Sequence, residues 1–149
     1  MRVFASWSGG KDCCFACHEA SKSGLEVAYL LNMVSEDSAR SSSHGTEARL
    51  MAAQAEAMGI PILQCPSTFE GYEQVFKRAI SELKHQGIEG GIFGDIDMEE
   101  HREWVERVCA ESGISAYLPL WGQSQKQVLA GFAAVNIIKS KVSKIPNSV

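Results

Sequence analysis

The sequence has no hydrophobic run long enough to span a membrane, and the residues after its first short apolar stretch are polar rather than a secretory leader. Basic residues are not in excess: 14 Lys and Arg stand against 18 Asp and Glu, for a net charge of -4. This balance argues against a surface that grips nucleic acid without regard to sequence. We therefore expect a cytoplasmic protein that binds neither membranes nor nucleic acid.

Paired cysteines are also lacking. The five cysteines are an odd number, and three of them crowd into positions 13–17, which is not the spacing of a disulfide framework. With 149 residues, of which 45% are hydrophobic, the chain can bury one sizeable core without covalent cross-links. We expect one α/β domain over residues 1–138 and a loosely ordered tail over residues 139–149.

Short apolar runs alternate with amphipathic stretches along the chain. The predicted strands are residues 2–6, 26–33, 60–65, 91–94, 114–118 and 133–138, and the predicted helices are residues 11–23, 47–58, 71–86, 98–112 and 124–130. Between the second strand and the second helix, the serine-rich residues 35–43 indicate a loop. Such alternation is typical of a parallel sheet of five to six strands between two layers of helices.

The turn after the first predicted strand carries most of the functional information. Gly9 and Gly10 allow the backbone to bend sharply and to approach a ligand without a Cβ in the way. The helix that follows offers unpaired N–H groups and the positive end of its dipole. This combination favours a phosphate, although neither the Walker spacing nor the dinucleotide glycine pattern is present.

The side chains around these glycines suit the same ligand. Ser8 offers a hydroxyl donor, and Lys11 offers a positive charge for a phosphate chain. Asp12 offers a carboxylate that either binds Mg²⁺ or caps the helix. The ordinary alternative is a plain turn between a strand and a helix.

The segment Ser8–Cys13 resembles the PP-loop, S-G-G-x-D-S, of the ATP pyrophosphatases, which cleave ATP between the α and β phosphates. Cys13 stands where that pattern has its last serine, and a thiol is a weaker hydrogen-bond donor than a hydroxyl. The resemblance implies a Rossmann-like fold of the adenine nucleotide alpha hydrolase (HUP) type. It makes all six residues candidate ATP ligands.

More narrowly, the sequence is similar to the diphthine–ammonia ligase family, also called the DUF71 group. The matching pieces beyond the PP-loop are His44, Gln54–Pro61, Gly94–Ile96, Glu100–Arg102 and Pro119–Gly122. Family members usually continue into a further acidic, glycine-rich segment that this chain lacks.

Gly94 and Asp95 follow the fourth predicted strand, at the sheet edge where the PP-loop is expected. Gly94 would let the backbone approach the nucleotide, and Asp95 is a candidate catalytic residue that binds ribose, metal or the incoming nucleophile. Asp97 either takes part in the site or caps the next helix.

Three further residues have two interpretations each. His44 is either a contact for phosphate or the acyl substrate, as the resemblance implies, or a solvated histidine. Arg102 either holds a phosphate or carboxylate of the substrate or forms a surface ion pair with Glu99 or Glu106. Trp121 either stacks on a ligand or closes the edge of the core.

The segment Cys14–His18 matches the haem-attachment pattern C-x-x-C-H, and its two cysteines also suggest a redox or zinc site. Haem attachment requires export, and a zinc site requires about four ligands. We favour buried cysteines that pack the first helix on the sheet.

The resemblance implies an amide-forming ligase that uses ATP and Mg²⁺. The acceptor would attack the α phosphorus, pyrophosphate would leave, and ammonia or another amine would displace AMP, with Lys11, Asp12 and Asp95 as catalytic residues and Asp12 as the metal ligand. The acceptor would be a diphthine-bearing elongation factor or a smaller molecule. A homodimer is left open. The alternative is a sensor domain of the same fold that binds an adenine nucleotide without turnover.

Overall fold

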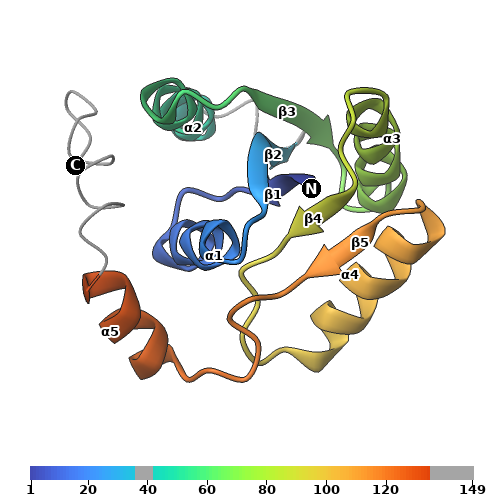
Figure 1. Ribbon diagram of the computed structural model, residues 1–149. Coiled ribbons are helices and arrows are strands. Elements are labelled where there is room, and N and C mark those ends of the chain that lie inside the picture. The colour runs from blue at the N-terminus through green and yellow to red at the C-terminus, as the bar shows by residue number, and fades with distance from the viewer. Residues whose placement is uncertain (36–41, 135–149) are drawn as a thin grey trace.

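The computed structural model describes the backbone of residues 1–35 and 42–134, with side chains described for 1–35 and 48–134 (Figure 1). Five strands alternate with five helices. In chain order they are β1 (Arg2–Ser6), α1 (Lys11–Lys22), β2 (Glu26–Ser35), α2 (Ser42–Met58), β3 (Ile62–Ser67), α3 (Tyr72–His85), β4 (Gly90–Ile92), α4 (Glu99–Glu111), β5 (Ser115–Tyr117) and α5 (Gln125–Ala134).

The strands form one parallel sheet in the order β3-β2-β1-β4-β5. Helices cover both of its faces, α1, α2 and α5 on one side and α3 and α4 on the other (Figure 1). The expected Rossmann-like α/β fold is confirmed. The chain order reverses around β1, so the segments that follow β1 and β4 meet at the carboxyl edge of the sheet, where ligands bind in such folds.

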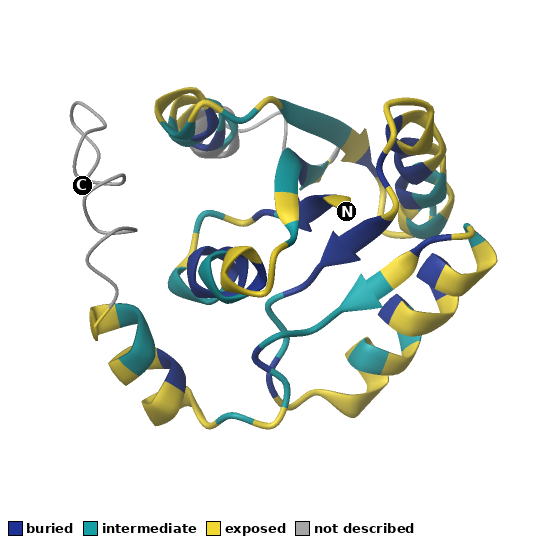
Figure 2. Ribbon diagram, viewed as in Figure 1, coloured by how far each residue is buried: buried dark blue, intermediate teal, exposed yellow. Residues whose placement is uncertain are grey.

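The central strands have continuous apolar runs because both of their faces are buried (Figure 2). Val3 and Ala5 point to the α1 side of the sheet. Phe4 points to the α3 side, where its ring lies edge-on to Phe76 at 6.2 Å and to Phe93 at 5.9 Å. These contacts hold the start of the PP-loop segment between two packed layers.

The expected sixth strand over residues 133–138 is wrong at its first two positions. Ala133 and Ala134 are the last residues of α5, and residues 135–138 lie outside the described part of the chain. A short apolar run does not by itself distinguish a strand from a buried helix. Here Val128 is buried as α5 packs against α1, which gives the helical arrangement its core contact.

Two boundaries also differ from expectation. β2 continues to Ser35, and α2 already begins at Ser42, so the expected loop over residues 35–43 is shorter at both ends. Residues 36–41 and the expected tail, 139–149, lie outside the description. Across the residues that the structure describes, no helix combines the length and apolar character needed to cross a membrane.

Candidate active site

The turn between β1 and α1 is an open cradle of backbone N–H groups. Gly10 is the N-cap of α1, and no side chain caps the helix there. Gly9 has a φ of +80°, and a Cβ on it would lie 2.5 Å from the Met51 side chain. This position therefore requires glycine, both for its backbone conformation and for its close contact with α2. The uncapped N–H groups and the helix dipole suit an anion.

Three cavities in the described part of the structure border this turn. The smallest, about 80 Å³ in volume, is lined by Gly9, Gly10, Lys11 and Phe132 among others. The other two are larger. The β4-side cavity, about 330 Å³ in volume, is lined on its polar side by Ser8, Asp12, Cys13, Asp95 and His101. The α2-side cavity, about 490 Å³, is lined by Ser8, Gly9, Gly10 and residues of β2 and α2. The PP-loop segment thus forms the wall that the two cavities share.

Gly94 brings the turn after β4 against the first turn of α1. A Cβ built on Gly94 would lie 3.1 Å from the carbonyl carbon of Asp12 and 3.2 Å from the backbone nitrogen of Cys13. The absence of a side chain on Gly94 allows the two backbones to come this close. As a result, Asp95 lines the same cavity as Asp12.

His101 is a site residue whose role the sequence reasoning did not identify. Its Nδ1 lies 2.5 Å from Oδ1 of Asp95, and its ring stacks on Trp104 with centroids 6.2 Å apart. The one available signal was its place in the matching segment Glu100–Arg102, six residues after Asp95. The Asp95–His101 pair forms one wall of the β4-side cavity.

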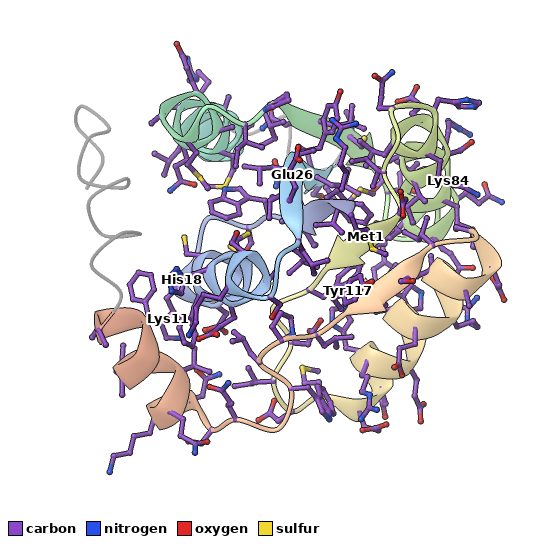
Figure 3. The ribbon with its side chains drawn as sticks, in the orientation of Figure 1. Met1, Lys11, His18, Glu26, Lys84 and Tyr117 are labelled. Carbon is purple, nitrogen blue, oxygen red and sulfur yellow. The ribbon has the colours of Figure 1, made fainter. Side chains whose placement is uncertain are left out.

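Lys11 faces α5 rather than the β4-side cavity. Its Nζ lies 2.9 Å from Oδ1 of Asp12 and 3.1 Å from Oε1 of Gln125, and Figure 3 shows it on the α1 side that faces α5. Lys11 therefore neutralises part of the Asp12 charge in this structure. A phosphate chain would have to draw the ammonium away from Gln125.

Arg102 lies outside both cavities. Its guanidinium stacks on the Trp121 ring at 4.9 Å from the centroid and forms ion pairs with Glu106 at 3.4 Å and Glu99 at 3.8 Å. The surface ion pairs considered from the sequence are therefore present. His44 lies in the first turn of α2, and its side chain is outside the described residues.

Cys13 lies within the loop itself. Its Sγ accepts a hydrogen bond from Ser8 Oγ at 3.7 Å and donates to the Gly10 carbonyl at 3.2 Å. A hydrogen bond from the Cys14 thiol, together with those from Ser8 and Gly9, lowers the pKa of Cys13 to about 6 against the opposing effect of burial.

The other cysteines of α1 are core residues. Cys14 and Cys17 are buried, and burial raises the pKa of Cys17 to about 12. All five cysteines are free. No group of three metal-ligating side chains occurs among the residues the structure describes.

A series of hydrogen bonds connects the start of the PP-loop segment to the sheet and to α2. The Trp7 indole donates to Gln54 at 3.0 Å, Asn32 donates to the Trp7 carbonyl at 3.0 Å, and Gln64 donates to Asn32 at 3.1 Å. These contacts connect β1, β2, β3 and α2 at the point where the chain leaves the sheet. They fix the entry of the PP-loop segment, a role the sequence pattern did not reveal for Asn32.

A comparison with known protein families shows to which family the chain belongs. The sequence pattern of the diphthamide synthase N-terminal domain matches residues 1–116. The chain belongs to this family. The matched residues include the PP-loop segment and the turn that carries Gly94 and Asp95.

A solved structure shares the fold of this diphthamide synthase family member. PH1313 from Pyrococcus horikoshii superposes with a TM-score of 0.54 at 14% sequence identity, over 87% of this chain. The chain corresponds to 39% of the length of PH1313. No curated protein matches the sequence.

Proposed function

We propose that this chain is an ATP pyrophosphatase-type ligase, similar to diphthine–ammonia ligase, that activates an acyl acceptor by adenylation and then forms an amide. The observation that carries the proposal is the uncapped Gly9–Gly10 turn next to a cavity that contains both Asp12 and Asp95. Family membership supports the same chemistry.

In the first step, a carboxylate oxygen of the acceptor attacks the α phosphorus and pyrophosphate leaves. Negative charge grows on the departing β phosphate, so catalysis requires positive potential that is already in place. The N–H groups at the start of α1 supply it from one side. Lys11 supplies it from the other when its ammonium turns from Gln125, 3.1 Å away, to the phosphate chain.

The oxygen ligands available at this site, the Asp12 carboxylate and the phosphates of ATP, suit Mg²⁺. Asp12 is a carboxylate on the cavity wall, and Mg²⁺ in proteins is usually held by one or two carboxylates together with substrate phosphates. Asp12 would hold the ion. When bound, Mg²⁺ neutralises charge on the phosphate oxygens and aligns the phosphate groups of ATP. No larger set of protein ligands is needed for this role.

The two cavities suggest how the substrates are divided between them. We assign the nucleoside of ATP to the larger α2-side cavity, where Met33, Val34 and Met51 offer apolar surface. The acceptor and the amine would then enter the β4-side cavity, on the other side of the phosphates. A diphthine-bearing elongation factor is the acceptor that the family name suggests.

The experiment is an incubation of the protein with Mg²⁺, ATP, ammonium and candidate acceptors, followed by separation of the nucleotides. Equal amounts of AMP and pyrophosphate that depend on the acceptor support the ligase. Release of ADP, or unchanged ATP despite nucleotide binding, contradicts it. The second of these results would support the non-catalytic sensor, which the present engagement of Lys11 with Asp12 and Gln125 favours.

A further inference from the structure

The β4-side cavity has an electrostatic character that the proposed ligase leaves unexplained. Asp12 and Asp95 line it, whereas no Lys or Arg occurs among the described residues of its wall. Lys11 pairs with Asp12 at 2.9 Å, so Asp95 contributes the charge that lacks an Arg or Lys partner. A cavity of this kind attracts a small cation.

Aromatic rings form much of the remaining wall. Trp7, Tyr72 and Phe93 line the cavity together with Asp95 and His101. Burial raises the pKa of Tyr72, and the charge of Asp95 raises it further, so the phenol keeps its proton next to that carboxylate. Carboxylate and ring faces together are the usual surroundings of a bound ammonium group.

The geometry of His101 defines a proton acceptor in the same place. A carboxylate oxygen can only accept a hydrogen bond, so the 2.5 Å contact with Asp95 places the ring proton on Nδ1. In the neutral ring, Nε2 then carries the free electron pair. Stacking on Trp104 at an interplanar angle of 4° holds the ring in this orientation.

We propose that the Asp95–His101 pair receives the amine substrate, which enters the β4-side cavity as a small ammonium ion attracted by the charge of Asp95 and gives its proton to Nε2 of His101. This inference rests on the proposed ligase function and adds the residues that receive the second substrate. It also gives Asp95 a specific role among the three considered from the sequence. Asp95 orients the His101 ring through Nδ1 and is a positioning residue, whereas His101 contacts the reacting amine through Nε2 and is a catalytic residue.

The transfer step balances as follows. After one proton passes to His101, the nitrogen electron pair attacks the acyl carbon of the adenylate and the C–N bond forms. The bond between the acyl carbon and the phosphate oxygen breaks, and AMP leaves with that electron pair. With ammonium as the amine, acyl adenylate and ammonium yield amide, AMP and two protons, one of which leaves through His101 and the other directly to water.

The test uses the full chain without nucleotide, so that its result does not depend on AMP formation. ¹⁵N-labelled protein is titrated with methylammonium chloride, and in parallel with tetramethylammonium chloride and with sodium acetate. We expect methylammonium to shift the backbone signals of Gly94 and Asp95 and the ring nitrogen signals of His101. Tetramethylammonium has no N–H proton to give, so it should leave the ring nitrogen signals of His101 unchanged even if the aromatic wall binds it. Acetate has the wrong charge and should shift none of these signals.

Two site variants and one control make the assignment specific. Asp95→Asn keeps the shape but removes the charge that attracts the cation, and should weaken methylammonium binding by about tenfold or more. His101→Gln changes a half-exposed side chain and should abolish proton uptake from the bound amine. Asp97→Asn, at an exposed carboxylate outside the cavity wall, should bind as the unmodified protein does.

The proposal is overturned if Asp95→Asn binds methylammonium with unchanged affinity, if the shifts map to the glutamates of α4 instead, or if acetate produces them. Should amine binding fail in this way while AMP and pyrophosphate still form, the ligase stands and only the amine site is lost. Should the amine bind as expected while ATP stays intact, the proposed function is lost.

Discussion

Gly94 follows β4 and Asp12 lies in the first turn of α1, yet their backbones are packed so closely that a Cβ on Gly94 would lie 3.1 Å from the Asp12 carbonyl carbon. This contact joins the turn after β4 to the first turn of α1. Both candidate carboxylates, Asp12 and Asp95, line one cavity as a result. The site therefore depends on a backbone contact as much as on its functional groups.

Gly94→Ala tests this contact. The added methyl group forces the β4 turn away from α1 by a few tenths of an ångström, which shifts Asp95 within the cavity. We expect AMP formation to fall by less than the roughly 100-fold that a misplacement of about 1 Å costs. Amide NMR shifts should change at Asp12 and Cys13. Activity equal to the unmodified protein would mean that the two turns are independent.

Lys11→Ala tests the role of the PP-loop lysine. Loss of its charge removes electrostatic stabilisation of the departing pyrophosphate, and AMP formation should fall by about 100-fold or more. The thermal midpoint should change little because the side chain is about one-third exposed. Lys22→Ala, in the last turn of the same helix, serves as the control and should keep full activity. Unchanged AMP release in the Lys11 variant would remove this residue from the mechanism.

Glu73 gives a prediction about pH. Its carboxylate on α3 accepts hydrogen bonds from Arg107 of α4 and pairs with Lys77, and these contacts lower the pKa of Glu73 from 4.5 to about 2. A lowered pKa means that the contribution of this carboxylate to stability is present above pH 4.5 and is lost as the pH falls towards 2. NMR titration should show this shift directly.

The matched variants for this titration are on one helix. Arg107→Gln should return the Glu73 pKa towards 4.5, because the hydrogen bonds from the Arg107 guanidinium are lost. Arg102→Gln, whose partners are Glu99 and Glu106, should leave it unchanged. An equal effect of both variants would point to long-range attraction by positive charge on α4 and against the specific pair.

Phe4→Ala tests the core that supports the loop. Phe4 is fully buried and meets the rings of Phe76 and Phe93, so its truncation should destabilise the fold by about 3–5 kcal/mol. Urea unfolding measures this change. Because Phe4 is two residues before the end of β1, folded variant protein should also bind ATP more weakly. A cost below about 1 kcal/mol would show that the site collapses around the missing ring.

Local patterns in the sequence predicted much of the fold. Strand β1 is apolar on both faces and the glycines of the PP-loop leave few alternatives, so the parallel sheet and the anion cradle followed directly. The run at residues 133–138 has no such pattern. Its apolar residues fit a strand or a helix equally well, and the packing of α5 on α1 decides the structure of Ala133 and Ala134.

The site was predictable only in part, for a related reason. Asp95 could be placed because it follows a strand of a parallel sheet. His101 could not, since its contact with Asp95 depends on the rotation of α4 that Trp104 packing sets. Likewise the direction of Lys11 depends on Gln125, which is 114 residues away in sequence.

A crystal structure of the protein with Mg²⁺ and a non-hydrolysable ATP analogue tests the central claim most directly. The account predicts that the β and γ phosphates lie within hydrogen-bonding distance of the backbone N–H groups of Gly9, Gly10 and Lys11, with the α phosphate facing Asp95. Calorimetry on the same mixture should register binding. Phosphates bound elsewhere, or an empty PP-loop in crystals saturated with the analogue, would contradict it.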